Sequence, residues 1–122
     1  MSTYEFFSDE ELTCQCGCGQ MAMDAQFMRK VVEGRRVLGF PFMVTSGYRC
    51  SEHNNNVSGS GYNGPHTLGR AIDIKANSRQ KFLVMNYFMG EGMTRFGVAG
   101  SFIHFDDLTE HDLFDEEVVW TY

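Results

Sequence analysis

The chain has 122 residues, a formal net charge of −6 and a sequence pI of about 5.1, and 14% of its residues are aromatic. This length predicts one domain spanning residues 1–122, and the aromatic content excludes a disordered chain. The acidic balance excludes the basic surface that nucleic acid or anionic lipid would need, and no apolar run approaches the ~18 residues of a membrane span. We therefore expect a small molecule or a neutral polymer as the partner, and neither nucleic acid nor a membrane.

The predicted elements begin with a short helical turn, because Ser8 and Glu11 form a capping-box pattern. A segment rich in Gly and Cys follows at 14–19 and has the pattern of neither a helix nor a strand. Apolar residues then recur at helical spacing from Asp24 to Leu38, where a Gly and a Pro end the helix. The next segment, Phe42–Thr45, is a candidate strand.

The main irregular stretch is Ser51–Pro65, in which most residues are Ser, Asn, Gly or Pro. A loop of this length in a small domain is usually functional, so we expect it to line a cleft. Beyond it, a strand, a helix and two further strands are predicted at Arg70–Lys75, Ser78–Met89, Ser101–Phe105 and Val118–Tyr122. This order predicts an α+β fold, with helices packed on one side of a small antiparallel sheet.

Polar residues in apolar surroundings indicate a chemical site. Asp73 lies in a predicted strand between Ile72 and Ile74, and a buried carboxylate there is costly unless it is paired or bound to metal. His66 leaves the end of the irregular stretch, and Gly69 lets the chain bend back so that His66 can face Asp73. We therefore expect His66 and Asp73 to lie together.

A second polar pair lies in the aromatic strand that follows, because His104 and Asp106 are two residues apart and share one face. Two histidines and one carboxylate are a common set of ligands for a catalytic zinc ion. The same pattern also allows a structural interpretation, in which the histidines only make hydrogen bonds and Asp73 pairs with Arg70 or Lys75.

Several motifs together resemble a known family. The segment Thr45-Ser-Gly-Tyr-Arg49, the motif His66-x-x-Gly-x-Ala-x-Asp73 and a later strand with His104 are similar to those of the zinc D-alanyl-D-alanine carboxypeptidases. That family includes phage murein endopeptidases that cut L-alanyl-D-glutamate bonds, and it shares the fold of the hedgehog signalling domain. The start, Phe7-Ser-Asp-Glu-Glu-Leu-Thr-Cys14, and the end, Trp120-Thr-Tyr122, resemble the small phage and prophage members.

The resemblance also implies roles for particular residues. The zinc ligands that it implies are His66, Asp73 and His104. Arg49 matches the arginine that holds a substrate carboxylate or stabilises the oxyanion, a role that suits its planar fork of donors. Ser46 and Tyr48, in the same motif, are candidate substrate-binding residues.

The implied activity is zinc-dependent hydrolysis of peptidoglycan stem peptides in phage-encoded lysis of the cell wall. The bond would be that of a D-Ala-D-Ala carboxypeptidase or an L-Ala-D-Glu endopeptidase. The first residues lack the charge and the apolar stretch of a secretory signal, so we expect synthesis in the cytoplasm. Action is expected in the host periplasm or on a phage particle, by a monomer whose partner is a peptidoglycan peptide.

Two positions depart from the pattern of that family. Ser101 stands three residues before His104, where better-known members have a catalytic Asp or Glu, and Gly64 replaces a serine. Asp106 is therefore the candidate general base. Alternatively it is the third zinc ligand, with His104 as a proton donor or as a residue that positions a ligand. The missing carboxylate also leaves a rival function, that of a catalytically silent, zinc-stabilised binding or structural module of a virion.

The four cysteines form a separate group at Cys14, Cys16, Cys18 and Cys50. Cys-x-Cys-x-Cys is tighter than the usual zinc knuckle, although Cys50 could complete a four-sulfur zinc site. One disulfide to Cys50 and four free thiols are the alternatives. The two remaining histidines, His53 and His111, are expected at the surface.

Overall fold

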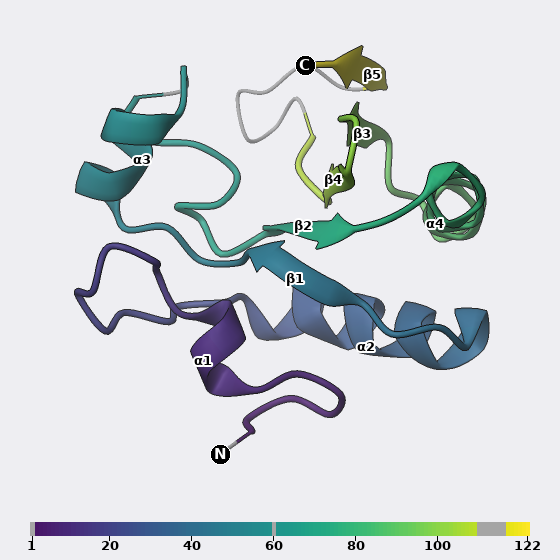
Figure 1. Ribbon diagram of the computed structural model, residues 1–122, viewed down its shortest axis with the longest axis horizontal. Helices are drawn as coiled ribbons and strands as arrows, with labels where there is room; N and C mark the ends of the chain where they lie inside the picture. The colour runs from purple at the N-terminus through teal and green to yellow at the C-terminus, as the bar shows by residue number, and fades with distance from the viewer. Residues whose placement is uncertain (1, 60, 110–116) are drawn as a thin grey trace.

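A computed structural model describes residues 2–59, 61–109 and 117–122, and its strands form one five-stranded sheet (Figure 1). The strands are β1 (Met43–Ser46), β2 (Ala71–Lys75), β3 (Arg95–Val98), β4 (Phe102–Asp106) and β5 (Val118–Thr121), in the spatial order β1-β2-β4-β3-β5. Neighbouring strands are antiparallel except β3 and β5, which are parallel. The predicted α+β class is confirmed, with a sheet that is mostly rather than wholly antiparallel.

The helices are α1 (Asp9–Leu12), α2 (Ala25–Leu38), α3 (Ser51–Val57) and α4 (Ser78–Gly90). The predicted capping box is present at α1, where the Glu11 N–H donates to Ser8 Oγ and the Ser8 N–H donates to Glu11 Oε1. The cap of α4 is Asn77, one residue before the expected start, and it forms a second capping box. Within the described residues, no helix is long and apolar enough to cross a membrane.

The two faces of the sheet have different chemistry. Along β2 and β4, Ile72 pairs with Phe105 on one face, and Asp73 pairs with His104 on the other. The apolar face packs against α2 and α4, because the Phe105 ring lies 6.3 Å from that of Phe27 and stacks on Phe88 at 4.5 Å. This places the core on one side of the sheet and leaves the polar face for a site.

The prediction of an irregular stretch over 51–65 is wrong for its first half, which forms α3. Three consecutive asparagines disfavour a helix, because their side chains compete for backbone hydrogen bonds. Here Asn54 is buried, and its side chain makes other hydrogen bonds. Its Nδ2 donates to Gly61 O, and its Oδ1 accepts from Arg49 Nη1. Side-chain contacts with the segments just before and just after α3 therefore overcome the weak helix preference of its asparagines.

Strand β3 is absent from the sequence prediction. Its four residues include Gly97, and glycine is depleted in strands, so the local pattern is weak. Pairing with β4 on one side and β5 on the other supplies the backbone partners that stabilise it. Because β5 joins the sheet beside β3 rather than beside β4, it forms the end of the sheet opposite β1 and α2 (Figure 1).

Candidate metal centre and cleft

Three buried side chains meet on the polar face of the sheet. Asp73 of β2 lies directly across from His104 of β4, and His66 reaches them from the loop before β2. His104 Nδ1 lies 2.8 Å from Asp73 Oδ1 and 3.2 Å from His66 Nε2, and His66 Nε2 lies 3.2 Å from the same carboxylate oxygen. The three predicted ligands are therefore brought together, each with one donor atom toward the others.

A sharp bend before β2 positions His66. Gly69 has φ +70°, and a Cβ there would collide with the Ala22 carbonyl oxygen. The Gly69 N–H donates to His66 O, and Gly69 O accepts from the Asp24 N–H. The predicted reversal at Gly69 is present, and glycine alone combines this positive φ with this close approach.

The second nitrogen of each histidine ring is also engaged. His66 Nδ1 lies 2.7 Å from the carbonyl oxygen of Gly47, which can only accept, so Nδ1 carries the proton. His104 Nε2 lies 2.7 Å from Asp106 Oδ2. These contacts fix both rings and leave Nε2 of His66 and Nδ1 of His104 as the coordinating atoms, as the outer partners of metal-binding histidines commonly do.

Burial and charge set the ionisation of the three groups. Burial opposes ionisation of Asp73, but hydrogen bonds with His104 and His66 outweigh it and hold the pKa of this carboxyl well below its usual range. Burial lowers the pKa of His66; burial also acts to lower the pKa of His104, but Asp106 and Asp73 outweigh it and raise that pKa. An ionised carboxylate and a neutral His66 are the states that bind a metal.

The donor set fits zinc. Ligands at the usual 2.0–2.1 Å from a tetrahedral zinc lie about 3.3–3.4 Å apart, close to the two separations of 3.2 Å that His66 Nε2 makes here. Two imidazole nitrogens and one carboxylate oxygen make three ligands, which leaves a fourth position. Arg70, one of the two alternative partners expected for Asp73, donates from its Nε to Asp107 Oδ1 at 2.8 Å.

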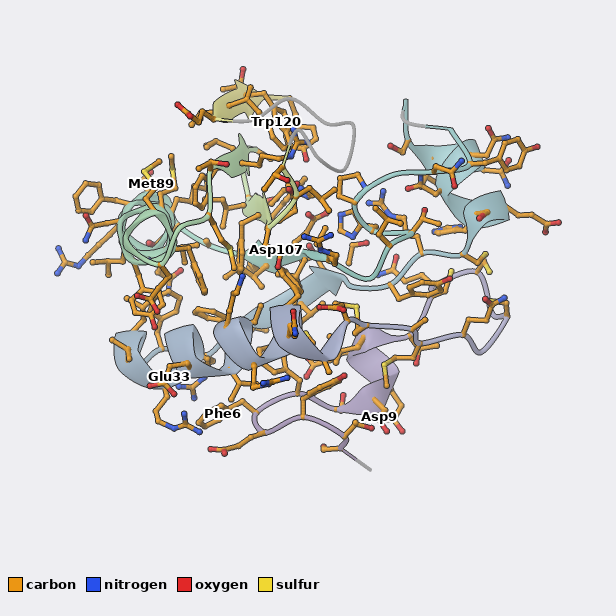
Figure 2. All side chains as sticks on the ribbon, turned by 180° about the vertical axis from the view of Figure 1, so that it is seen from behind. Phe6, Asp9, Glu33, Met89, Asp107 and Trp120 are labelled. Atoms are coloured by element: carbon orange, nitrogen blue, oxygen red, sulfur yellow. The ribbon has the colours of Figure 1, made fainter. Side chains whose placement is uncertain are left out.

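The triad opens into a cleft of about 580 Å³. Its aromatic walls are Phe102, Trp120 and Tyr122, and α3 contributes Asn54 and Val57. Trp120 extends from β5, at the end of the molecule opposite α2 (Figure 2). The cleft therefore combines a metal-binding base with apolar walls and can hold part of an extended ligand.

Arg49 is the cation beside the triad. Its Nε donates to Ser46 Oγ and its Nη1 donates to Asn54 Oδ1, both at 3.2 Å, and its Nη2 lies 3.7 Å from Asp73 Oδ2. The side chain is 18% exposed and lines the cleft. The predicted Arg49 and Ser46 are thus brought to the site, with Ser46 holding the guanidinium.

Other candidate residues lie outside the cleft. Asp106 is fully buried behind His104, and its Oδ1 accepts from Arg95 Nε at 2.8 Å and from the Leu108 N–H at 3.2 Å. Tyr48 is half-buried and packs against the hydrophobic core. The catalytic role of Asp106 and the substrate-binding role of Tyr48 stay predictions, and His111 lies outside the described residues.

Arg95 and Trp120 are among the residues of the site that sequence reasoning missed. Arg95 lines the cleft, binds Asp106 and lies 5.3 Å from the Trp120 ring. Trp120 packs over Gly97, where a Cβ would come within 2.6 Å of the indole, and its ring lies 5.2 Å from that of His104. The available signal was Arg95, a charged residue two positions before Gly97. It indicates a site only once β5 is known to pair with β3 and to bring Trp120 over Gly97.

A small α+β fold that sets two histidines and a carboxylate beside an arginine in an open cleft is the arrangement of a metal-dependent hydrolase. A sequence model of one family, described as Peptidase M15, matches residues 5–106. The match covers most of the chain, so the chain belongs to the Peptidase M15 family of zinc metallopeptidases, as its motifs predicted. No curated protein and no solved structure gives a significant match.

Proposed function

We propose that this protein is a zinc peptidase that hydrolyses the stem peptides of peptidoglycan, in phage-encoded lysis of the cell wall. Its site of action would be the host periplasm or a phage particle. The observation that carries the proposal is the convergence of His66, Asp73 and His104 at the base of a cleft that also holds Arg49. The bond that the enzyme hydrolyses would be D-Ala-D-Ala if it is a carboxypeptidase, or L-Ala-D-Glu if it is an endopeptidase.

In this proposal, three groups of residues have different roles in peptide hydrolysis. His66, Asp73 and His104 would hold a zinc ion, which would supply Lewis acidity to a carbonyl and to a water molecule. Arg49 is held by Ser46 and Asn54 with its guanidinium at the cleft, where it can bind a substrate carboxylate or the oxygen that becomes negative. The aromatic wall of the cleft excludes water and orients the peptide; it is formed by Phe102, Trp120 and Tyr122.

The second candidate is a zinc-stabilised binding module without catalysis. Among the described residues that line the main cleft, Asp73 is the sole carboxylate, and it is itself a predicted ligand. Ser101 cannot act as a carboxylate base, and both oxygens of Asp106 already accept hydrogen bonds. These contacts favour a positioning role for Asp106 behind His104, and they are the observation that supports the silent module.

Product analysis on purified peptidoglycan decides between the two candidates. We expect the zinc-loaded protein to release free D-alanine, as a carboxypeptidase, or peptides with a new amino-terminal D-glutamate, as an endopeptidase. His66→Ala should release neither. Co-sedimentation with peptidoglycan without any product, by a protein with zinc bound, would instead support the binding module.

A further inference from the structure

We propose that Cys14, Cys16, Cys18 and Cys50 form a second zinc site, closed and structural, which joins the N-terminal turn to the start of α3. All four Sγ atoms lie within 4.8 Å of one another. They are also the only four cysteines of the chain. Neither the peptidase site nor the proposed function uses them, so this inference is independent of both.

The sulfur separations match one shared ion. Cys16 Sγ lies 3.5 Å from Cys14 Sγ and 3.6 Å from Cys50 Sγ. Ligands at the usual zinc–sulfur distance of 2.3 Å lie about 3.8 Å apart around a tetrahedral ion. Cys16 thus approaches two sulfurs at once, and the four thiols converge on one point.

Backbone hydrogen bonds prepare the two buried sulfurs for negative charge. Cys14 Sγ accepts from the Cys50 N–H at 3.3 Å, and Cys50 Sγ accepts from the His53 N–H at 3.4 Å. Donors to sulfur favour the thiolate, which is the form that binds metal. Cys14 and Cys50 are buried, whereas Cys16 and Cys18 are exposed, so an ion has a route of entry from one side.

The turn that carries three of the cysteines is held in place independently. The Cys14 N–H donates to Gln20 O at 2.8 Å and closes the turn, and Gln15 Nε2 donates to Thr45 O at 2.6 Å. The cluster is therefore assembled from two segments that the backbone already brings together. A four-sulfur set without an open position is typical of structural rather than catalytic zinc.

This site would stabilise the wall of the catalytic cleft. Cys50 directly follows Arg49 and caps α3, whose Asn54 accepts a hydrogen bond from Arg49. On the other side, the Tyr48 N–H donates to Leu12 O, which lies two residues before Cys14. A zinc ion on the four sulfurs would fix the segment 48–54 against the N-terminal turn.

Metal content and thiol counting on the protein purified under reducing conditions test the proposal without any activity assay. We expect two zinc ions per chain, and four thiols that react with a mercurial reagent only as one zinc is released. Substitution with cobalt should give an intense thiolate-to-cobalt charge-transfer band. One zinc per chain with four freely reactive thiols, or disulfides in the protein isolated under these conditions, would overturn the proposal.

Variants assign the ions to the two sites. Cys16→Ser/Cys18→Ser should keep one zinc and lose the charge-transfer band, whereas His66→Ala should keep one zinc and retain the band. Gln20→Ala is the matched control and should keep two zinc ions. Gln20 closes the turn through its backbone carbonyl, and its exposed side chain has no sulfur atom to offer a metal. A double cysteine variant that still binds two zinc ions would contradict the assignment, and the wild-type measurements stand even if that variant fails to fold.

Discussion

At the scale of single residues, the site depends on which ring nitrogen faces which neighbour. Gly47 O accepts a hydrogen bond from His66 Nδ1, and Asp106 Oδ2 accepts one from His104 Nε2. The two rings would therefore offer different nitrogens to a metal ion, Nε2 of His66 and Nδ1 of His104. Sequence spacing placed His104 and Asp106 on one face, but only the ring orientation shows that Asp106 lies on the Nε2 side of His104, away from His66 and Asp73.

Asp106→Asn tests this orientation. The substitution removes the charged acceptor of His104 Nε2, so we expect the affinity for zinc to fall about 10–100-fold. Activity should return in part at saturating zinc, because the ligands themselves remain. Competition with a chelator of known affinity measures the change, with Asp107→Asn as the control, since Asp107 pairs with Arg70. Unchanged zinc affinity with no activity at saturating zinc would instead make Asp106 the general base.

Arg49→Ala tests the cation at the cleft. We expect kcat/KM to fall by about 10²–10³ with zinc content unchanged, because a donor to developing negative charge is lost. A rise in KM alone indicates binding of a ground-state carboxylate, whereas a fall in kcat indicates stabilisation of the oxyanion. Arg36→Ala, which removes a surface arginine paired with Glu5, should leave both constants unchanged. Full activity of Arg49→Ala would exclude both roles.

At the scale of the elements, the cleft is lined by segments whose residues have a weak preference for the helix or strand that they form. Helix α3 contains three asparagines and strand β3 contains Gly97, and neither was predicted. Each is stabilised by contacts with segments outside the element itself: Asn54 of α3 by Arg49 and Gly61, and β3 by pairing with β4 and β5. Conversely α2, with its apolar stripe, Asp24 cap and Gly39 end, lies where its pattern predicted, because all its signals are local.

Asn54→Ala measures the contribution of the buried amide to α3. The change leaves Gly61 O and Arg49 Nη1 without this partner, and we expect a loss of about 1–3 kcal/mol in the free energy of unfolding. Urea denaturation gives the value, and Asn56→Ala, an exposed position of the same helix, is the control. Equal stability of the two variants would show that the Asn54 contacts do not stabilise the helix.

Gly97→Ala tests the contact between β3 and Trp120. A Cβ would come within 2.6 Å of the indole, so the ring must shift, at a cost of about 1–3 kcal/mol in stability. Trp120 is the sole tryptophan of the chain, so its fluorescence reports this contact directly. Gly100→Ala, where the added Cβ meets nothing within 4 Å, should leave the spectrum unchanged. An unaltered spectrum for Gly97→Ala would mean that the indole does not pack there.

At the scale of the whole molecule, the sheet separates stability from chemistry. Its apolar face carries the aromatic core with α2 and α4, and its polar face carries Asp73, His104 and Asp106. Buried charge is costly unless compensated, so the polar face depends on its internal pairs and on a bound cation. Zinc should therefore contribute to folding as well as to catalysis.

Removal of zinc should lower the unfolding temperature. A ligand that binds only the folded state at a free concentration 1,000 times its Kd stabilises by about 4 kcal/mol. We expect chelation to remove a stabilisation of this order, measured by calorimetry before and after dialysis and after zinc is restored. The shift in unfolding temperature that chelation causes in His66→Ala measures how much of the stabilisation comes from zinc bound outside the triad. An unfolding temperature independent of zinc would contradict coupling between the metal and the fold.

The family, the α+β class and the convergence of His66, Asp73 and His104 could be predicted from the amino-acid sequence alone, because they depend on local motifs and on the two-residue period of a strand. The folded chain was needed to reveal the partners of Asp106, the inclusion of Arg95 and Trp120 in the cleft, and the proximity of four sulfurs from residues 14–18 and 50. Those features depend on which strands pair and in what register. Such pairing is set by the whole core, which no local pattern encodes.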